Sequence, residues 1–268
     1  MELDTITHLL IDGDGVLYKR NDPLPGFDAL FAALAKRDIG WALLTNNATR
    51  DVSDYVEKLG ALGVEATEGQ IFSSARATAE TLKARYAEGD HLYVIGMQGL
   101  VDSLEAAGFV CHQGDDVPDQ PVRAVVTALD LDITYGKIAA AMHLIRAGAA
   151  FIATNPDLTF PTPEGLYPGA GTIVAAVEAA SGVEPEVIGK PEKAIFEAAL
   201  GYLGADRAHA AVVGDRLNTD ILGGQAVGIG TILVMSGVTT PEELAESDIQ
   251  PDVVMRGIDE LAEALNAL

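Results

Sequence analysis

The chain has 268 residues, 49% of them hydrophobic, which is enough to bury the core of one large domain or of two ordinary ones. Its 40 Asp and Glu against 17 Lys and Arg leave a formal charge of −23, which argues against nucleic acid as a partner and fits a solvated acidic surface or a high-salt habitat. The single cysteine, Cys111, excludes an internal disulfide, and together with an N-terminus that lacks signal-peptide features it favours a cytoplasmic protein.

Strand-like and helical runs alternate at both ends of the chain. Near the N-terminus, apolar runs at 7–11 and 41–45 precede segments with helical spacing near 25–37 and 49–62. Near the other end, strand-like runs with helices between or after them lie at 185–189, 210–214, 231–236 and 252–254. This alternation predicts an α/β fold with a Rossmann-like, doubly wound parallel sheet.

The middle of the chain, residues 78–182, contains alternating units of its own. Strand-like runs lie at 91–96, 109–112, 123–129 and 149–155, with helices at 134–146 and from about 171. They predict a second α/β domain, a cap inserted into a core formed by residues 1–77 and 183–268. The long uncharged stretch 221–241 holds five glycines and ends in polar residues and proline, so we expect no membrane span there.

Polar side chains follow the predicted core strands, at the carboxyl ends where open parallel sheets bind ligands. They are Asp12 and Asp14 after the first strand, Thr45, Asn46 and Asn47 after the second, Lys190 after the run at 185–189, and Asp215 and Asp220 after the run at 210–214. Taken singly, an Asp-Gly pair commonly forms a turn, a threonine caps a helix, and a lysine is a solvated surface residue. Their joint position at the ends of several strands favours a site.

These residue types suit phosphoryl chemistry. Converging carboxylates that offer only oxygen ligands suit Mg²⁺, while a lysine, a hydroxyl and an amide can stabilise the charged oxygens of a phosphoryl group. No Ser-His or Cys-His pair is evident, so an aspartate is the natural nucleophile and would form an aspartyl-phosphate. A second aspartate two residues away can donate a proton to the leaving oxygen and later accept one from water.

Four motifs carry a resemblance to a known family: "DGDGVLY" at 12–18, "LLTNN" at 43–47, "GKP" at 189–191 and "GDRLNTD" at 214–220. In this order they resemble the motifs of haloacid dehalogenase (HAD) superfamily phosphatases. The insertion between the second and third motifs resembles the large α/β (C2-type) cap of subclass IIA. That subclass includes p-nitrophenyl phosphate, phosphoglycolate, pyridoxal phosphate and nucleotide phosphatases, and the resemblance spans nearly the whole chain.

The resemblance implies a role for each motif residue. Asp12 would be the nucleophile and a Mg²⁺ ligand, and Asp14 the general acid and base whose backbone carbonyl also binds the metal. Asp215 would complete the protein's metal ligands, and Asp220 would support the metal-bound waters or Lys190. Phosphate would be bound by residues of the second and third motifs, namely Thr45, Asn46 and Lys190, with Asn47 nearby.

In the cap, residues 153–172 resemble the segment that faces the active site in this subclass. That likeness makes Asn155, Asp157 and Phe160 candidate substrate contacts. Pyridoxal phosphatases similar to this chain carry a histidine near the position of Phe160, so pyridoxal phosphate is disfavoured as a substrate. The resemblance further implies a small phosphorylated metabolite as substrate and a homodimer with contacts through the caps.

Two other functions share parts of this pattern. A phosphotransferase or phosphomutase would use the same core chemistry and release little inorganic phosphate. A receiver-like phosphoacceptor, which is not an enzyme, also combines an acidic pair, a threonine and a lysine at strand ends, but such domains are much shorter and lack an inserted cap. We therefore expect Mg²⁺-dependent hydrolysis of small-molecule phosphate monoesters through an aspartyl-phosphate on Asp12.

Overall fold

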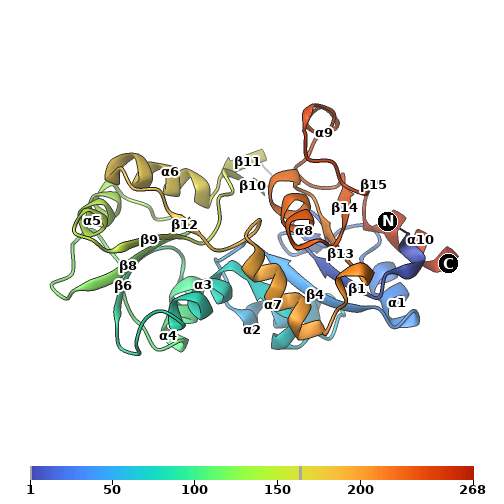
Figure 1. The fold of residues 1–268 in the computed structure, drawn as a ribbon, viewed down its shortest axis with the longest axis horizontal. Helices are drawn as coiled ribbons and strands as arrows, with labels where there is room; N and C mark the ends of the chain where they lie inside the picture. Colours follow the sequence, from blue (N-terminus) through green and yellow to red (C-terminus); the bar gives the residue numbers. More distant parts are fainter. Residues whose placement is uncertain (1, 163–164) are drawn as a thin grey trace.

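The computed structural model describes residues 2–162 and 165–268. Two parallel β-sheets, of six and five strands, lie side by side along the long axis of the molecule (Figure 1). Both chain ends lie at the far end of the six-stranded half. The chain thus leaves the first sheet, builds the second and returns, and the predicted α/β core with an inserted α/β unit is confirmed.

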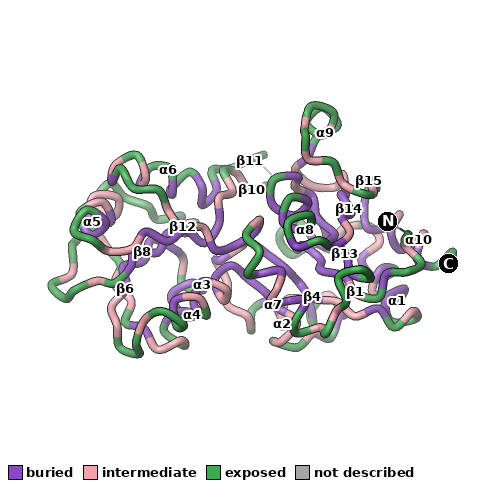
Figure 2. The backbone as a smooth tube through the Cα atoms, in the orientation of Figure 1, coloured by how far each residue is buried: buried purple, intermediate pink, exposed green. Residues whose placement is uncertain are grey.

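The six-stranded sheet has the strand order β15-β14-β13-β1-β4-β5. Its strands are β1 (His8–Ile11), β4 (Gly40–Thr45), β5 (Ile71–Ser73), β13 (Ala210–Gly214), β14 (Gly230–Val234) and β15 (Val253–Met255). One face is covered by α7 (Lys193–Leu203) and α8 (Leu222–Val227), and the other by α1 (Phe27–Lys36), α2 (Val52–Ala61) and α10 (Ile258–Ala267). Because helices cover both faces, the central strands are buried (Figure 2) and read as nearly continuous apolar runs.

Helix α2 begins at Val52, later than the predicted start near residue 49. The side chain of Asp51 accepts a hydrogen bond from the backbone N–H of Asp54 at 3.0 Å, and the Asp54 carboxylate accepts one from the backbone N–H of Asp51 at 3.3 Å. This reciprocal capping box satisfies amide groups that the start of a helix leaves free, so the helix starts there. Residues 46–50 remain a loop at the carboxyl end of β4.

The five-stranded sheet has the strand order β12-β9-β8-β6-β7. Its strands are β6 (His91–Ile95), β7 (Val110–His112), β8 (Val122–Thr127), β9 (Ala150–Ala153) and β12 (Glu186–Val187). One face packs against α3 (Ser74–Lys83) and α4 (Gln98–Ala106), and the other against α5 (Tyr135–Arg146) and α6 (Ala170–Ser181), as Figure 1 shows. This half is a complete layered unit with two apolar cores of its own.

The prediction that the run at 185–189 belongs to the core sheet is wrong, because β12 pairs in parallel with β9 of the five-stranded sheet. Helix α3 likewise packs Ala75 and Leu82 against that second sheet. A short apolar run shows no sign of which sheet edge it will join, since its neighbours are distant in the sequence. The elements of the second half extend slightly beyond the limits 78–182, and division of the chain at those limits stays a prediction.

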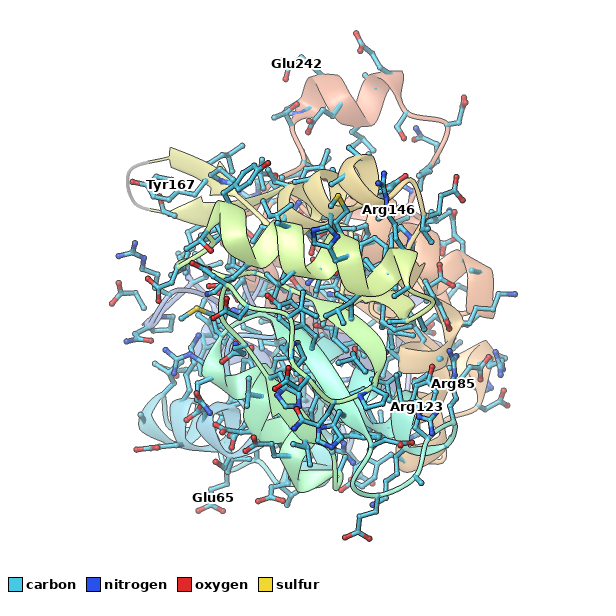
Figure 3. All side chains as sticks on the ribbon, turned by 90° about the vertical axis from the view of Figure 1, so that its left-hand side faces the viewer. Glu65, Arg85, Arg123, Arg146, Tyr167 and Glu242 are labelled. Atoms are coloured by element: carbon cyan, nitrogen blue, oxygen red, sulfur yellow. The ribbon has the colours of Figure 1, made fainter. Side chains whose placement is uncertain are left out.

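Two short antiparallel hairpins accompany the sheets. One pairs β2 (Tyr18–Lys19) with β3 (Asp22–Pro23), and the other pairs β10 (Thr159–Thr162) with β11 (Gly165–Pro168). Residues 163 and 164, within the segment predicted to face the active site, lie outside the described residues. Figure 3 looks onto the five-stranded half, with Arg146 of α5 and Tyr167 of β11 labelled.

The uncharged stretch 221–241 forms helix α8, a turn and strand β14, as the sequence predicts. The remaining helix of the first half, α9 (Pro241–Glu246), is short and begins directly after a threonine cap. Within residues 2–162 and 165–268, no helix is long and apolar enough to cross a membrane.

Candidate active site

Three carboxylates meet at the carboxyl ends of two neighbouring strands. Asp12 follows β1 and Asp215 follows β13, and these strands pair in parallel. Asp220 lies in a π-helical turn, Leu217–Ile221, that leads from β13 into α8. One carboxylate oxygen of each residue lies within 4.8 Å of the others, and all three residues are buried. The parallel sheet thus gathers charges that are far apart in the sequence.

The ammonium group of Lys190 lies among these carboxylates, with only 2% of its side chain exposed. Its Nζ donates hydrogen bonds to Asp12 Oδ1 at 2.6 Å, to Asp220 Oδ1 at 2.6 Å and to the carbonyl of Leu44 at 2.9 Å. These bonds use all three N–H groups of the ammonium. Burial by itself would lower the pKa of Lys190, but the two carboxylates outweigh it and raise that pKa, so the lysine is charged.

Three carboxylates face one ammonium, so with all three carboxylates ionised the buried cluster would carry two negative charges in excess. Burial raises the pKa of Asp12 well above its usual range; Lys190 opposes this shift, and the neighbouring carboxylates add to it. Burial, with the charge of Asp220, likewise raises the pKa of Asp215 to about 7. A bound divalent cation would balance these charges and keep the carboxylates ionised.

The available donor atoms suit such a cation. Oδ1 of Asp215 is buried and has no hydrogen-bond partner within the described part of the chain, while its Oδ2 accepts a backbone N–H at 2.8 Å. Both oxygens of Asp220 are engaged, one by Lys190 and the other by the backbone N–H of Arg216. Asp12 and Asp215 are therefore better placed than Asp220 to bind a metal directly. An all-oxygen set of this kind fits Mg²⁺.

Asp14 makes no bond to Lys190 and accepts a hydrogen bond from an amide. Its Oδ2 accepts a hydrogen bond from Asn47 Nδ2 at 3.2 Å. The loop that carries Asn47 is held by Tyr55, whose hydroxyl donates to the Asn47 carbonyl at 2.9 Å, and by Thr45, whose Oγ1 accepts the Asn47 N–H at 3.1 Å. The two aspartates of the first motif thus occupy different electrostatic surroundings. A metal contact by the Asp14 carbonyl stays a prediction.

The side chain of Asn46 connects the two halves of the molecule. Its Oδ1 accepts the backbone N–H of Lys190 at 2.8 Å, and its Nδ2 donates to the Lys190 carbonyl at 3.0 Å and to Asp157 Oδ2 at 3.1 Å. The Asn46 carbonyl accepts a further bond from Asn155 Nδ2 at 2.8 Å. Both N–H groups of the Asn46 amide are therefore in use, and they tie the Lys190 loop to the cap segment.

Arg216 makes a second connection between the two halves of the molecule. Its Nη2 donates to the carbonyl of Thr159 in β10 at 2.8 Å, and its Nη1 lies 4.0 Å from Asp157 Oδ1. Burial raises the pKa of Asp157, and Arg216 opposes that shift. Sequence reasoning did not single out Arg216, although its position inside the "GDRLNTD" motif was a usable signal.

A cavity of about 660 Å³ opens between the two halves. Every predicted site residue lines it except Asp215, which is buried behind its wall at 1% exposure. Sequence reasoning missed several other lining residues: Arg20, Arg50 and Lys58 from the core half, and Met97, Leu129 and Leu131 from the cap. Nothing in their local spacing marks them, because they reach the cavity only through the packing of the two halves.

Two segments of the chain match families of hydrolases. Residues 9–110 match the haloacid dehalogenase-like hydrolases, and residues 187–263 match a family described as HAD-hydrolase-like. The acid sugar phosphatase of Staphylococcus saprophyticus is 38% identical over 256 residues, which cover 96% of each chain. This chain belongs to the HAD-like hydrolases.

Solved structures resemble this HAD hydrolase over nearly its whole length. The 4-nitrophenylphosphatase of Thermotoga maritima has a TM-score of 0.89 and 34% identity, over 98% of both chains. The glycerol phosphate phosphatase of Mycobacterium tuberculosis, solved in complex with magnesium, has a TM-score of 0.84 and 32% identity, over 97% of this chain and 76% of that one.

These relatives support the subclass IIA resemblance, and this HAD hydrolase is a phosphoric monoester hydrolase. The alternative of a receiver-like phosphoacceptor without enzymatic activity is thereby set aside.

Proposed function

We propose that this HAD hydrolase removes the phosphoryl group from small phosphate monoesters in a Mg²⁺-dependent reaction, through an aspartyl-phosphate formed on Asp12. The observation that carries this proposal is the buried cluster at the cavity wall, in which three carboxylates face a single ammonium and would carry two excess negative charges when ionised. An anionic substrate can approach such a cluster only if a cation balances it. The magnesium held by the solved glycerol phosphate phosphatase supports the choice of metal.

The reaction divides into two steps between Asp12 and Asp14. In the first, the Asp12 carboxylate attacks phosphorus, the bond to the leaving oxygen breaks, and Asp14 gives that oxygen its proton. In the second, Asp14 takes a proton from water, whose oxygen attacks phosphorus and releases inorganic phosphate and free Asp12. The hydrogen bond from Asn47 orients Asp14 for both proton transfers.

The surrounding residues bind and orient the phosphoryl group. Mg²⁺, held by Asp12, Asp215 and the Asp14 carbonyl, would supply positive charge to the phosphoryl oxygens. Thr45 would offer its hydroxyl, and Lys190 the charge of its ammonium. Because its amide is fully bonded, Asn46 would act on the phosphate by holding Lys190 and the cap in place.

The substrate class is a small phosphorylated sugar or polyol, a choice supported by the names of the acid sugar phosphatase and the glycerol phosphate phosphatase. Asn155, Asp157 and Phe160 line the cavity from the cap and would select the leaving group. Phe160 packs edge-on against Tyr167, with ring centres 6.2 Å apart, and offers an apolar wall beside the polar pair.

The test is a panel of phosphate esters, including 4-nitrophenyl phosphate and sugar and polyol phosphates, scored for release of inorganic phosphate. We expect turnover with Mg²⁺, its loss in EDTA, and its recovery when Mg²⁺ is added back. Ca²⁺ should inhibit, because its larger and looser coordination disturbs in-line geometry. Unchanged activity in EDTA would refute the metal assignment, and transfer to an added alcohol with little phosphate release would favour a phosphotransferase.

A further inference from the structure

The cavity wall near Asp14 carries two cations that the proposed reaction does not use. Arg50 lies in the loop before α2, Lys58 lies within α2, and both line the cavity. Basic side chains are scarce in this chain, with 17 Lys and Arg against 40 Asp and Glu. Two of them on one wall of the active-site cavity therefore call for an explanation.

Lys58 is held in place by an aromatic ring. Its Nζ lies 3.1 Å from the centre of the Tyr18 ring, and Tyr18 itself is fully buried. Burial lowers the pKa of Lys58 to about 8; Asp14 opposes that shift, and the charge of Arg50 adds to it. The ammonium is therefore partly withdrawn from water and close enough to Arg50 to be repelled by it.

Arg50 is fixed through its backbone. A side chain at Gly99 of α4 would come within 2.5 Å of the Arg50 backbone, so this cap helix packs directly on the loop. Within residues 2–162 and 165–268, neither the Arg50 guanidinium nor the Lys58 ammonium has a hydrogen bond or an ion pair with another residue. The carboxylate of Asp54, one turn before Lys58, also lines the cavity, and one of its oxygens accepts the backbone N–H of Asp51 in the capping box of α2. Within the described residues, neither Asp14 nor Asp54 forms an ion pair with either cation, because their hydrogen bonds come from the Asn47 amide and from the backbone N–H of Asp51.

We propose that Arg50 and Lys58 form a subsite for a second anionic group of the substrate, in addition to the phosphoryl group at Asp12. This inference rests on the proposed function and narrows it to monoesters whose leaving group carries a carboxylate or a second phosphate. Guanidinium and ammonium groups in partly buried sites bind such anions through charge-assisted hydrogen bonds. Leu129 and Leu131 line the same cavity from the cap and suit the short carbon chain between two anions.

The test compares non-hydrolysable probes that differ in the second group. Phosphonoacetate has a carboxylate where ethylphosphonate has a methyl group, and methylenediphosphonate has a second phosphonate. Affinities for the full chain are measured by isothermal titration calorimetry with Mg²⁺ present. We expect one of the two doubly anionic probes to bind at least about 10-fold more tightly than ethylphosphonate, and the tighter of the two identifies the second anion.

Variants assign the preference to the subsite. Lys58→Met and Arg50→Gln should each reduce the preference for the doubly anionic probe over ethylphosphonate by about 10-fold. Lys58→Arg keeps the charge and should retain this preference. Lys83→Gln removes an exposed lysine outside the cavity and controls for a general loss of positive charge. A probe also chelates Mg²⁺ in solution, but to the same extent with every protein. The ratio of the affinities of wild type and variant for one probe therefore reports the contribution of the subsite alone. Thermal melting confirms that each variant is folded.

Equal affinity of the wild-type protein for all three probes would overturn the subsite. A preference that survives unchanged in folded Lys58→Met and Arg50→Gln proteins would overturn it as well. In either case, wild-type hydrolysis of 4-nitrophenyl phosphate with Mg²⁺ leaves the proposed function standing. Failure to hydrolyse any ester of the panel would instead overturn the proposed function, whatever the probes bind.

Discussion

Asp12 and Asp14 lie two positions apart but in different surroundings. Asp12 contacts the Lys190 ammonium at 2.6 Å inside the buried cluster, whereas Asp14 accepts a hydrogen bond from the Asn47 amide at 3.2 Å. Attack requires an ionised carboxylate, which a neighbouring cation stabilises, and proton transfer requires a group that can change its charge. The same Asp→Asn change should therefore have different consequences at the two positions.

Asp12→Asn would remove the proposed nucleophile, so turnover should fall by many orders of magnitude and no phosphoenzyme should form. Asp14→Asn would lose the proposed general acid and base, which should slow turnover by about 10²–10⁴-fold. With 4-nitrophenyl phosphate, whose leaving group needs no proton, the Asp14→Asn protein should become phosphorylated and then stall. Rapid quench and intact mass measure this burst. Equal behaviour of the two variants would mean that the roles are wrongly assigned.

Asp215 links the stability of the metal-free protein to pH. Its folded-state pKa of about 7 lies above the ordinary value of 3.8, so its stabilising contribution is complete at low pH and is lost as pH rises to about 7. Asn at this position stays neutral. In EDTA, wild type should therefore lose a few kcal/mol of unfolding free energy relative to Asp215→Asn between about pH 4 and 7.

Urea unfolding of both proteins at several pH values measures this difference. With Mg²⁺ present, the difference in unfolding free energy between the two proteins should no longer depend on pH, because a bound cation stabilises the ionised carboxylate. A difference that does not depend on pH in EDTA would contradict the raised pKa of Asp215.

The segment from Asn155 into β10 is the element that joins cap to core at the site. It is anchored by the bond from Asn155 to the Asn46 carbonyl and by the bond from Arg216 to the Thr159 carbonyl. Phe160 takes part in neither bond and packs instead on Tyr167 of the neighbouring strand. It can therefore be changed without cutting the link between the two halves.

Phe160→Ala should alter the ranking of substrates while leaving the chemistry in place. Removing an apolar side chain from a cavity wall changes discrimination between esters by about 10-fold or more, so relative kcat/KM should shift across the panel. Leu158→Ala is the matched control, since Leu158 is 64% exposed and does not line the cavity. If the ranking is the same in both variants and in wild type, Phe160 is not a substrate contact.

The whole molecule carries a net charge of −23, much of it on surface carboxylates such as Glu65 and Glu242 (Figure 3). Self-repulsion of this size destabilises the compact state, and salt screens it. Raising NaCl from about 20 mM to about 500 mM should therefore increase the Tm by a few degrees in calorimetry without Mg²⁺. Glu65→Lys should give part of the same increase at low salt. A Tm that falls or stays constant with salt would count against this repulsion.

The local sequence pattern predicts which helices and strands form better than it predicts which strands pair with one another. The strands β1, β4, β13 and β14 are apolar runs followed by helices, and the buried parallel sheet they form follows from that repetition. The run that contains β12 has the same local character, yet it joins the second sheet beside β9. Which sheet edge a short strand joins depends on backbone partners that are distant in the sequence. The spacing of apolar residues and the composition of the run therefore do not determine that edge.

By itself, the sequence determined the types of residue at the strand ends, and from them it predicted a phosphoryl chemistry centred on Asp12, Asp14 and Lys190. Only the tertiary structure decided which groups touch: Lys190 bonds Asp12 across 178 positions of chain, and Asp215 keeps a buried oxygen that has no partner among the described residues. It also brought Arg50 and Lys58 to the cavity wall. The reason is physical, because charge type is a property of each residue, whereas distance, desolvation and pKa arise only when packing brings separate segments together.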